Sequence, residues 1–419
     1  MFRKNFGGPR KAGPSRFPNS PHSRGGFRGG PRTQSRGGYG SRGGSSRGGG
    51  KTEKINFARF INKVQMTEEV AIFKPEHTFL DFKIVEPLKD AIRTKGYLLP
   101  TPIQDRSIPQ ILLGNDLVGV ANTGTGKTAA FLIPLINKVL LNRREQVLIM
   151  VPTRELAIQI DEELKLFTPD MKIYSVCCVG GAPIGRQISQ LRYQYNFIIG
   201  TPGRIKDLIE RRMIHLNEFR SLVLDEADRM LDMGFVRDMR AIMTGMPKER
   251  HTLFFSATIS PDIERLITEF LRNPLRISVK TQDISKNIEQ DVVCIKNGEN
   301  KTDVLCNLLN NKELTKVLIF GRTKHGVEKL SKILIQKGFK AESIHGNKTH
   351  GKRQEALNLF KNNRSSILVA TDVAARGLDI DNISHVINYD IPATNDDYVH
   401  RIGRTGRGSK KGKAITFVE

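Results

Sequence analysis

Three carboxylates follow a short apolar run in the segment "LVLDEADRM", residues 222 to 230: Asp225, Glu226 and Asp228. Packed carboxylates repel one another and resist burial, so such a cluster is favourable mainly where a cation lies among them. The simpler interpretation is a strand that ends in a solvent-exposed acidic turn. A metal-binding role requires a phosphate-binding element elsewhere in the chain.

The segment "ANTGTGKT", residues 121 to 128, is such an element. It follows the apolar run "DLVGV" and matches the phosphate-binding pattern GxxxxGKS/T, except that Ala121 replaces the first glycine. Gly124 and Gly126 allow backbone N–H groups to face phosphate oxygens, and Lys127 reaches the outer phosphates. Thr128 is left to hold Mg²⁺. The other positions of this loop expected to contact the nucleotide are Asn122, Thr123 and Thr125.

The two segments together predict hydrolysis of a nucleoside triphosphate. In nucleotidases of this architecture a second strand ends in a carboxylate that holds the same metal ion, so we expect Asp225 to bind Mg²⁺ through its water shell. Glu226 is expected to orient and deprotonate the attacking water. Because Lys127 and the metal would neutralise the acidic cluster, a solvent-exposed turn is no longer the favoured interpretation.

Short apolar strands alternate with helical stretches from about residue 79 onward, for example "VLIMVP", "FIIGTP" and "TLFFSAT", and later "VLIFGRT", "SILVATD" and "AITFVE". This alternation is typical of an α/β fold, in which a parallel sheet binds its ligands at the carboxyl ends of the strands. A polar stretch near 278–290 interrupts it. We expect two α/β domains, residues 79–278 and 291–419, with a linker at 279–290. Residues 51–78 are predicted to be a linker with one candidate amphipathic helix.

The charge of the chain points to a polyanionic partner. The 419 residues carry a formal net charge of +24, which favours nucleic acid over an anionic membrane. No apolar run has the roughly 18 to 20 residues of a membrane span, and the basic N-terminus lacks the apolar stretch of a secretory signal. We therefore expect a cytoplasmic protein without a membrane partner. The four cysteines lack the spacing of a zinc site.

Residues 1–50 contain 11 Lys and Arg, no Asp or Glu, and repeated RGG triplets interleaved with Phe27 and Tyr39. Such a composition buries too little apolar surface to offset its chain entropy, so a disordered arm is predicted. Guanidinium groups beside aromatic rings suit phosphates and unstacked bases, which favours weak, salt-sensitive RNA binding. The alternative is a tail that only increases solubility.

From Phe79 to Glu419 the chain resembles the DEAD-box ATP-dependent RNA helicases. The resemblance rests on an ordered set of motifs: "GYLLPTPIQ", "ANTGTGKT", "PTREL", "GG", "TPGR", "DEAD", "SAT", "LIFGRT", "ATDVAARGLD" and "HRIGRTGR". It implies two tandem RecA-like domains. The segment "SIHGNKTHGKRQEALNLF" looks most like the bacterial RhlE-type subgroup. Departures are small: Asn122 stands where Gln is usual, and His350 replaces the Gln of a QxxR element.

The resemblance assigns further roles at the nucleotide. Gln104 would read the edge of adenine and Phe79 would stack on the base, which together imply ATP. Arg404 and Arg407 match arginine fingers that act on the γ-phosphate, and Asp379 matches a ribose contact. The residues that match elements coupling hydrolysis to RNA are Asp228, Ser256, Ala257, Thr258 and His400.

The remaining motifs match a path for RNA. They combine hydroxyl groups, glycines and guanidinium groups, which contact phosphate and sugar, so binding should not depend on base sequence. In the first domain these residues are Pro152, Thr153, Arg154, Gly180, Gly181, Thr201, Pro202, Gly203 and Arg204; in the second they are Gly321, Arg322, Thr323, Gly346, Thr371 and Arg376.

The expected activity is ATP-dependent unwinding or remodelling of short RNA duplexes and ribonucleoproteins. An RNA clamp or annealing protein whose ATPase times its grip shares every motif, and an unwinding assay would separate the two. A DNA translocase is disfavoured by "PTREL" together with "DEAD".

Overall fold

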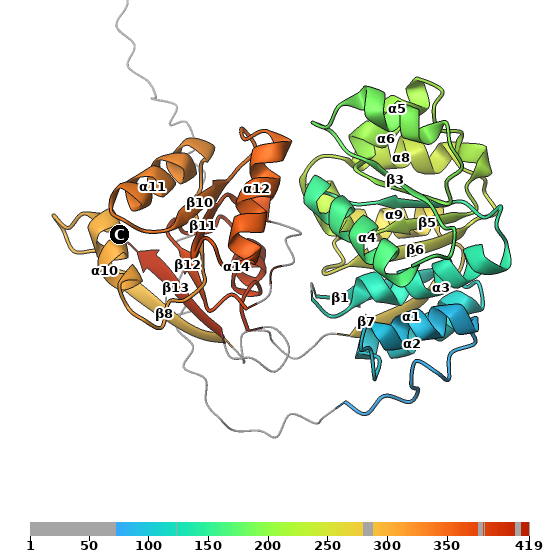
Figure 1. Cartoon of the computed structure of the whole chain (residues 1–419), viewed down its shortest axis with the longest axis horizontal. Coiled ribbons are helices and arrows are strands. Elements are labelled where there is room, and N and C mark those ends of the chain that lie inside the picture. Colours follow the sequence, from blue (N-terminus) through green and yellow to red (C-terminus); the bar gives the residue numbers. More distant parts are fainter. Residues whose placement is uncertain are drawn as a thin grey trace, which may run out of the picture. The chain divides into compact units, whose positions relative to one another are not determined.

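The computed structural model describes residues 73–122, 124–279, 288–375, 380, 382–406 and 412–418. The predicted RGG arm at 1–50, the candidate helix at 51–72 and most of the predicted linker at 279–290 lie outside these residues. Two parallel sheets flanked by helices make up the described chain (Figure 1).

The first sheet has seven described strands in the order β3-β4-β2-β5-β6-β1-β7, and every neighbouring pair is parallel. Its central strands are almost fully buried on both faces, as their Val, Ile and Leu content predicts. The strands are β1 (Leu117–Ala121), β2 (Val147–Met150), β3 (Ser175–Cys178), β4 (Phe197–Gly200), β5 (Ser221–Leu224), β6 (His251–Ser256) and β7 (Leu275–Val279).

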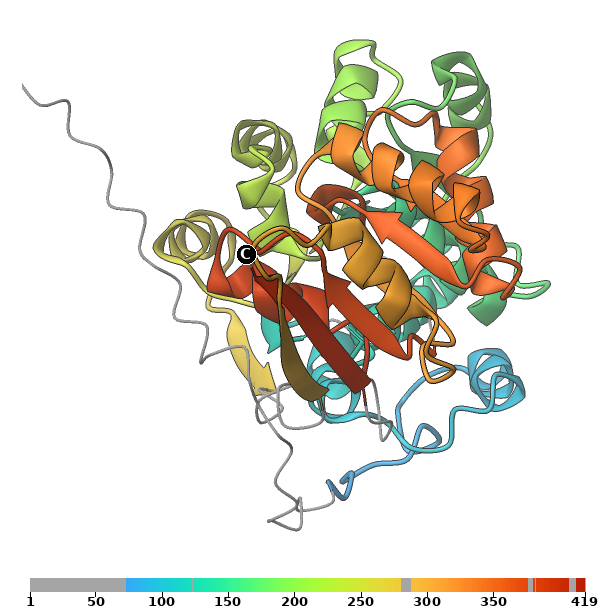
Figure 2. The same cartoon turned by 90° about the vertical axis from the view of Figure 1, so that its left-hand side faces the viewer.

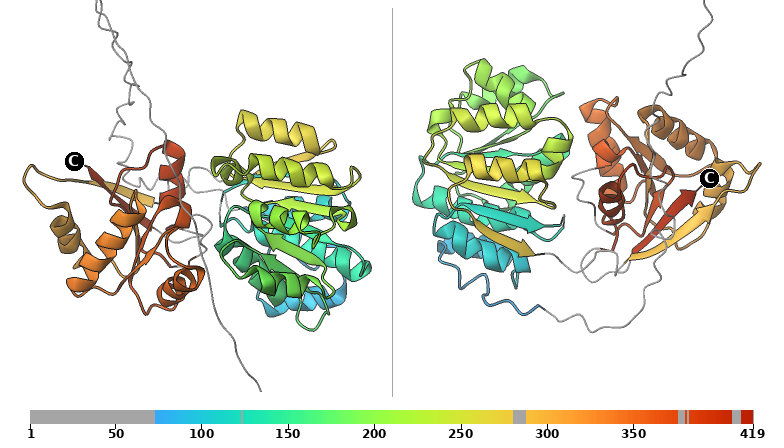
Figure 3. Two further views of the ribbon diagram at one scale, coloured as in Figure 1. Left: turned by 90° about the horizontal axis from the view of Figure 1, so that it is seen from above. Right: turned by 180° about the vertical axis from the view of Figure 1, so that it is seen from behind.

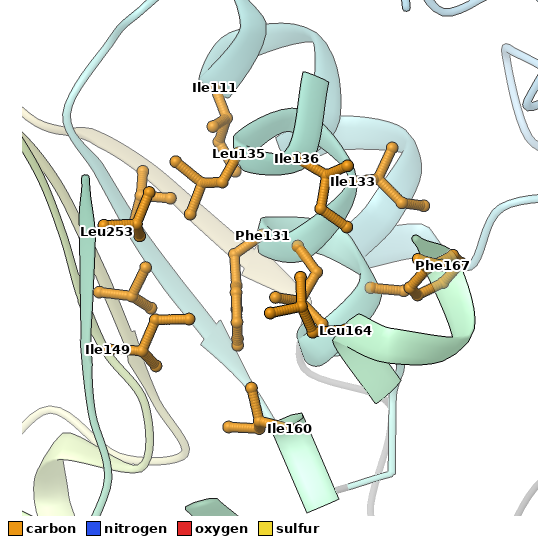
Figure 4. Packing of buried hydrophobic residues seen from close by; sticks show 14 of the residues in the cluster. Ile111, Phe131, Ile133, Leu135, Ile136, Ile149, Ile160, Leu164, Phe167 and Leu253 are labelled. Carbon is orange, nitrogen blue, oxygen red and sulfur yellow. The ribbon is translucent and has the colours of Figure 1, made fainter. Parts of the chain in front are cut away.

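Helices lie on both faces of this sheet (Figure 3). On one face Phe131 of α3 packs between sheet residues such as Ile149 and Leu253 and the α4 residues Ile160 and Leu164 (Figure 4). A second core fills the opposite face. The helices are α1 (Glu86–Thr94), α2 (Pro102–Leu112), α3 (Lys127–Leu141), α4 (Arg154–Phe167), α5 (Ile184–Leu191), α6 (Pro202–Glu210), α7 (Ala227–Asp232), α8 (Val236–Gly245) and α9 (Pro261–Phe270), with the short 3-10 helix η2 (Leu216–Glu218).

The second sheet has six described strands in the order β10-β11-β9-β12-β13-β8, again all parallel. Figure 2 shows its strands side by side, from β8 in gold to β13 in dark red. The strands are β8 (Ile288–Cys294), β9 (Val317–Phe320), β10 (Ala341–Ile344), β11 (Ile367–Ala370), β12 (His385–Asn388) and β13 (Gly412–Val418); the helices are α10 (Lys301–Leu309), α11 (Lys324–Gln336), α12 (His350–Lys361), α13 (Asp372–Ala375) and α14 (Asn395–Ile402).

Four helices begin at a threonine N-cap whose side chain makes a capping hydrogen bond. The side-chain oxygen of each cap accepts a hydrogen bond from a backbone N–H of the first helical turn, which satisfies a donor that has no partner within the helix. Two of these caps, Thr153 and Thr323, belong to motifs predicted to contact RNA. These motifs therefore sit at fixed strand-to-helix junctions.

The predicted α/β architecture is confirmed, and three strands are additional to those predicted: β3, β7 and β8. Strand β8 begins at Ile288, inside the stretch expected to be a linker. No helix among the described residues is long and apolar enough to cross a membrane.

Candidate active site

The predicted motifs of the first sheet follow the carboxyl ends of its strands. The motifs "PTREL", "GG", "TPGR" and "DEAD" begin after β2, β3, β4 and β5, whereas "ANTGTGKT" and "SAT" begin at the last residues of β1 and β6. All these strands are parallel, so their carboxyl ends share one edge of the sheet. Ligands of open α/β sheets bind at this edge.

The predicted phosphate-binding loop lies between β1 and α3. Gly124 and Gly126 have φ angles of +85° and +91°, which residues other than glycine rarely adopt. A Cβ atom on Gly126 would also lie 2.4 Å from Nε2 of Gln104. Thr125 donates its hydroxyl to the carbonyl of Asn122 at 2.8 Å, which closes the turn. Glycine is thus required at both positions for the loop to have this shape.

Lys127 is the first residue of α3 and is buried. Its Nζ donates to the carbonyl oxygen of Ala121 at 2.8 Å, across the loop. Thr128 follows it in the first turn of the helix and is partly exposed. A lysine held at the N-terminus of a helix beside turned backbone N–H groups forms a site for an anion.

Gln104 lies in α2 and its side-chain amide contacts this loop. Nε2 donates to the carbonyl of Gly126 at 3.0 Å, and Oε1 accepts from the backbone N–H of Thr101 at 2.9 Å, as part of a capping box. Both amide atoms therefore contact the backbone. Because each can make a second hydrogen bond, the predicted contact with adenine stays a prediction.

Phe79 is only 2% exposed and packs in the core of the first domain. Its ring stacks on Tyr97, with centroids 5.7 Å apart, and meets the edge of Phe82. The ring therefore has the environment of a core residue. Its predicted stacking on a base gains no support from this packing and stays a prediction.

Asp225 and Glu226 follow β5 and are both buried, at 3% exposure each. Burial raises the pKa of Asp225 to about 6; the nearby charge of Lys127 opposes this rise, and Glu226 and Asp228 add to it. Burying several ionised carboxylates close together costs free energy, and a bound divalent cation would offset that cost. The alternative interpretation of a solvent-exposed acidic turn does not fit these buried carboxylates.

The donor set fits Mg²⁺ held partly by a substrate. Among the described residues no group of three or more His, Cys, Asp or Glu side chains is arranged to hold a metal alone. Mg²⁺ commonly binds to one or two carboxylates together with water and substrate phosphates. Asp225, with the hydroxyl of Thr128, suits that mode.

Glu226 has a φ angle of +51° and forms the N-cap position of α7. Its backbone N–H donates to Oδ1 of Asp225 at 2.9 Å. Its Oε2 lies 3.5 Å from Nε of Arg229, which is also buried. A non-glycine residue in this conformation is uncommon, and such strain is found preferentially at functional sites.

Asp228 connects the acidic segment to the end of β6. Its Oδ2 accepts from the backbone N–H groups of Ala257 and Thr258, at 3.1 and 3.0 Å, and from the Thr258 hydroxyl at 3.1 Å. The Ser256 hydroxyl donates to the carbonyl of Thr258 at 2.7 Å. The structure therefore brings together the residues predicted to couple hydrolysis to RNA in the first domain.

The predicted RNA residues of the first domain also contact one another. Gly181 has a φ angle of +75°, and a Cβ atom there would lie 1.9 Å from Nη1 of Arg154. Arg204 donates from Nη1 to the carbonyl of Ala182 at 3.2 Å. Two arginines from two motifs thus lie against the glycine pair. The neighbouring positions Pro152, Thr153, Thr201, Pro202 and Gly203 lie at the same edge, after β2 and β4.

In the second sheet the predicted RNA residues again follow strands. Gly321, Arg322 and Thr323 follow β9, Gly346 follows β10 and Thr371 follows β11. The backbone N–H of Arg322 donates to Oδ2 of Asp390, beyond β12, at 2.7 Å. Thr371 is buried, whereas Arg322 is exposed.

Arg401 has a role that the sequence did not suggest, although it lies within the quoted "HRIGRTGR". Nε and Nη2 donate to the two carboxylate oxygens of Asp372 at 2.6 and 2.8 Å. Nη1 donates to Oδ1 of Asn388 at 3.2 Å and to the carbonyl of Asp390 at 2.6 Å, and the guanidinium lies over the ring of Phe320. Bidentate arginine pairs of this kind fix geometry as well as charge. Arg401 therefore fastens α14 to α13 and β12.

Arg404 follows α14 by two residues and is 3% exposed. Its Nε donates to the carbonyl of His400 at 3.3 Å. It lines a small pocket with Phe320, Asp372 and Arg401. The predicted residues Thr123, Arg376, Asp379 and Arg407 lie outside the described part of the chain.

Two family profiles match the chain. DEAD/DEAH box helicase matches residues 101–266, and helicase conserved C-terminal domain matches residues 300–409. These matches contain most of the motifs described above.

Relatives with the name ATP-dependent RNA helicase CshA match the same region. The protein from Limosilactobacillus reuteri is 44% identical over 341 residues, which are 81% of this chain and 69% of the relative. The protein from Listeria monocytogenes is 46% identical over 343 residues, 81% of this chain and 66% of the relative. This chain thus spans about two thirds of their length. The solved structure of S. cerevisiae Dbp5 bound to RNA and ADP BeF3 is 31% identical, with a TM-score of 0.72, over 82% of this chain and 89% of that chain.

Proposed function

Because the chain belongs to the DEAD/DEAH box helicase family, we propose that it is an RNA-dependent ATPase that opens or remodels short RNA duplexes and ribonucleoproteins. One observation carries this proposal: a buried lysine of the predicted phosphate-binding loop, an acidic cluster and a glycine pair between two arginines lie at one edge of the first sheet. The first two suit phosphoryl transfer, and the third suits a nucleic-acid backbone.

The chain's own residues would act at three stages of hydrolysis. The loop around Gly124 and Gly126 presents backbone N–H groups to the phosphates, and Lys127 neutralises charge on the outer ones. Asp225 and Thr128 would hold Mg²⁺, which when bound supplies positive charge to the β- and γ-phosphate oxygens. Glu226 orients the attacking water and accepts its proton.

RNA bound along the predicted path would change the position of the acidic segment 225–228. Asp228 binds the end of β6 through three hydrogen bonds, so a shift of Ala257 and Thr258 alters the position of the carboxylates before it. This connection gives RNA a route to influence hydrolysis. In the second domain, Arg404 and Arg407 are proposed to act on the γ-phosphate, Asp379 on the ribose, and His400 in coupling.

ATPase rates with single-stranded RNA, single-stranded DNA and no nucleic acid test the proposal, together with unwinding of a short RNA duplex. We expect stimulation by RNA over DNA and strand separation that requires ATP. RNA-stimulated hydrolysis without strand separation would indicate a clamp or annealing protein instead. Stimulation by DNA alone would contradict the RNA assignment.

Replacing Glu226 by glutamine should slow ATP turnover by about 10²-fold or more, because the amide keeps the size of the side chain but cannot accept the proton. ATP and RNA binding should be retained, so the complex with RNA should persist. Steady-state hydrolysis and RNA dissociation rates measure the two effects. Normal hydrolysis by a folded variant would show that Glu226 is not the base.

Removing residues 1–50 should leave the ATPase maximum near that of the full chain and weaken RNA affinity. Each phosphate contact on a single strand contributes roughly −0.7 to the slope of log affinity against log salt. If the arm makes several contacts, the slope should become shallower by that amount for each one. Fluorescence anisotropy with labelled RNA at several salt concentrations measures this slope, and an unchanged slope would mean that the arm only increases solubility.

Three finer assignments stay predictions. The segment 343–360 suggests an RhlE-type subgroup, whereas the relatives from Limosilactobacillus reuteri and Listeria monocytogenes carry the name CshA. The domain boundaries 79–278 and 291–419 and a cytoplasmic location rest on the sequence alone.

A further inference from the structure

Gln187 of α5 is a buried polar side chain that none of the predicted motifs includes. It is 4% exposed, and both atoms of its amide have protein partners. Nε2 donates to the carbonyl of Val179 at 3.0 Å, and Oε1 accepts from Nη1 of Arg204 at 3.0 Å. The amide therefore connects the end of β3 to the start of α6.

These contacts enclose the glycine pair 180–181. Val179 precedes the pair and Ala182 follows it, and both of their carbonyl groups are bound: one by Gln187, the other by Arg204. Arg204 is held in turn by Gln187, and its Nε lies 3.7 Å from Oδ2 of Asp207. The backbone on both sides of the glycine pair is thus hydrogen-bonded to the connected side chains of Gln187 and Arg204.

Arg154 of α4 lies against the same glycine pair. Its guanidinium occupies the space in which a Cβ atom on Gly181 would fall, and its Nη2 lies 3.4 Å from the Cβ position of Gly180. The two glycines therefore lie between Arg154 and the network of Arg204 and Gln187. This arrangement fixes the backbone conformation of Gly180 and Gly181 and the orientation of the Arg154 and Arg204 guanidinium groups.

We propose that Gln187 is a positioning residue for RNA: by binding Val179 and Arg204 together, it holds the glycine pair in the shape that contacts the strand. The inference rests on the proposed function, since it assumes that this edge of the sheet binds RNA. A buried amide costs free energy unless it is hydrogen-bonded. Here its two hydrogen bonds go to Val179, next to the glycine pair, and to Arg204, a predicted RNA contact. An apolar side chain would pack α5 equally well but would leave the carbonyl of Val179 without this donor.

Two substitutions separate the two hydrogen bonds of Gln187. Methionine, in Gln187→Met, keeps the length of the side chain and removes both bonds. Glutamate, in Gln187→Glu, keeps the acceptor for Arg204 and removes the donor to Val179. Gln190→Met is the matched control, because Gln190 lies on the same helix and is exposed.

The RNA concentration that half-saturates ATPase stimulation should rise about tenfold for Gln187→Met, about threefold for Gln187→Glu and less than about twofold for Gln190→Met. The KM for ATP should stay within about twofold of wild type in all three. Hydrogen exchange at the amides of residues 180–182 should be faster in Gln187→Met than in Gln190→Met.

Equal RNA half-saturation and equal exchange in Gln187→Met and Gln190→Met would overturn the proposal. So would a loss of RNA and ATP affinity in parallel with a lowered Tm, since Gln187 would then only stabilise the domain. If the wild-type chain shows no response to RNA, the proposed function fails, and the exchange measurement, which needs no RNA, still decides whether Gln187 fixes the glycine pair.

Discussion

Replacing Lys127 by alanine should reduce ATP hydrolysis by about 10³-fold or more. Its Nζ is buried beside the phosphate-binding loop, 2.8 Å from the carbonyl of Ala121, and its charge lowers the pKa of Asp225. A preorganised charge in a buried site stabilises the negative charge of a phosphoryl transition state strongly, because no reorganisation is needed as the reaction proceeds. The alanine variant loses that charge, and the Asp225 carboxylate loses the nearby positive charge that favours its ionised form.

Steady-state phosphate release with saturating single-stranded RNA measures the effect. Lys165→Ala is a suitable control, because Lys165 is an exposed lysine of the same domain whose Nζ forms an ion pair with Asp161. Neither Lys165 nor Asp161 belongs to a predicted site, so the control should remain fully active. Substantial ATP turnover by a folded Lys127→Ala variant would refute the assignment of the loop.

The strands missing from the sequence prediction are all at sheet edges. Strands β3 and β7 end the first sheet, and β8 ends the second. An edge strand is covered on fewer sides, so it needs fewer apolar residues than a central one. Strand β7 is mostly exposed, and β8 alternates buried and exposed residues over its first four positions. The continuous apolar runs that identified central strands are therefore absent from β7 and β8.

The site was predictable where its residues are adjacent in the sequence. In the loop 121–128 and in the acidic cluster, the residues that are expected to act together follow one another in the sequence. Contacts between distant residues were not predictable: Arg401 with Asp372, and Gln187 with Arg204, are brought together only by the fold. The packing of Phe79 was not predictable either, because the ring on which it stacks, Tyr97, follows α1 in the sequence.

Replacing Arg404 by alanine should reduce RNA-stimulated ATP turnover by about 10³- to 10⁵-fold, the contribution of an arginine finger, or roughly 4 to 7 kcal/mol of transition-state stabilisation. Arg404 belongs to the second sheet's domain, and the phosphate-binding loop belongs to the first. It can affect hydrolysis directly only if the two domains form one site around the nucleotide. ATP bound to the first domain alone does not need Arg404, so nucleotide affinity without RNA should change little.

Fluorescent-nucleotide titration without RNA, together with hydrolysis at saturating single-stranded RNA, separates binding from catalysis. Arg404→Lys should rescue little, because an ammonium group lacks the planar set of donors that a guanidinium presents to phosphate oxygens. Arg364→Ala is the matched control, since Arg364 is an exposed arginine of the same domain. Because Arg404 is buried and binds the carbonyl of His400, equal Tm values for the variants must accompany the comparison. Turnover by Arg404→Ala within about threefold of wild type would mean that the second domain does not complete the active site, since an arginine finger contributes far more than that.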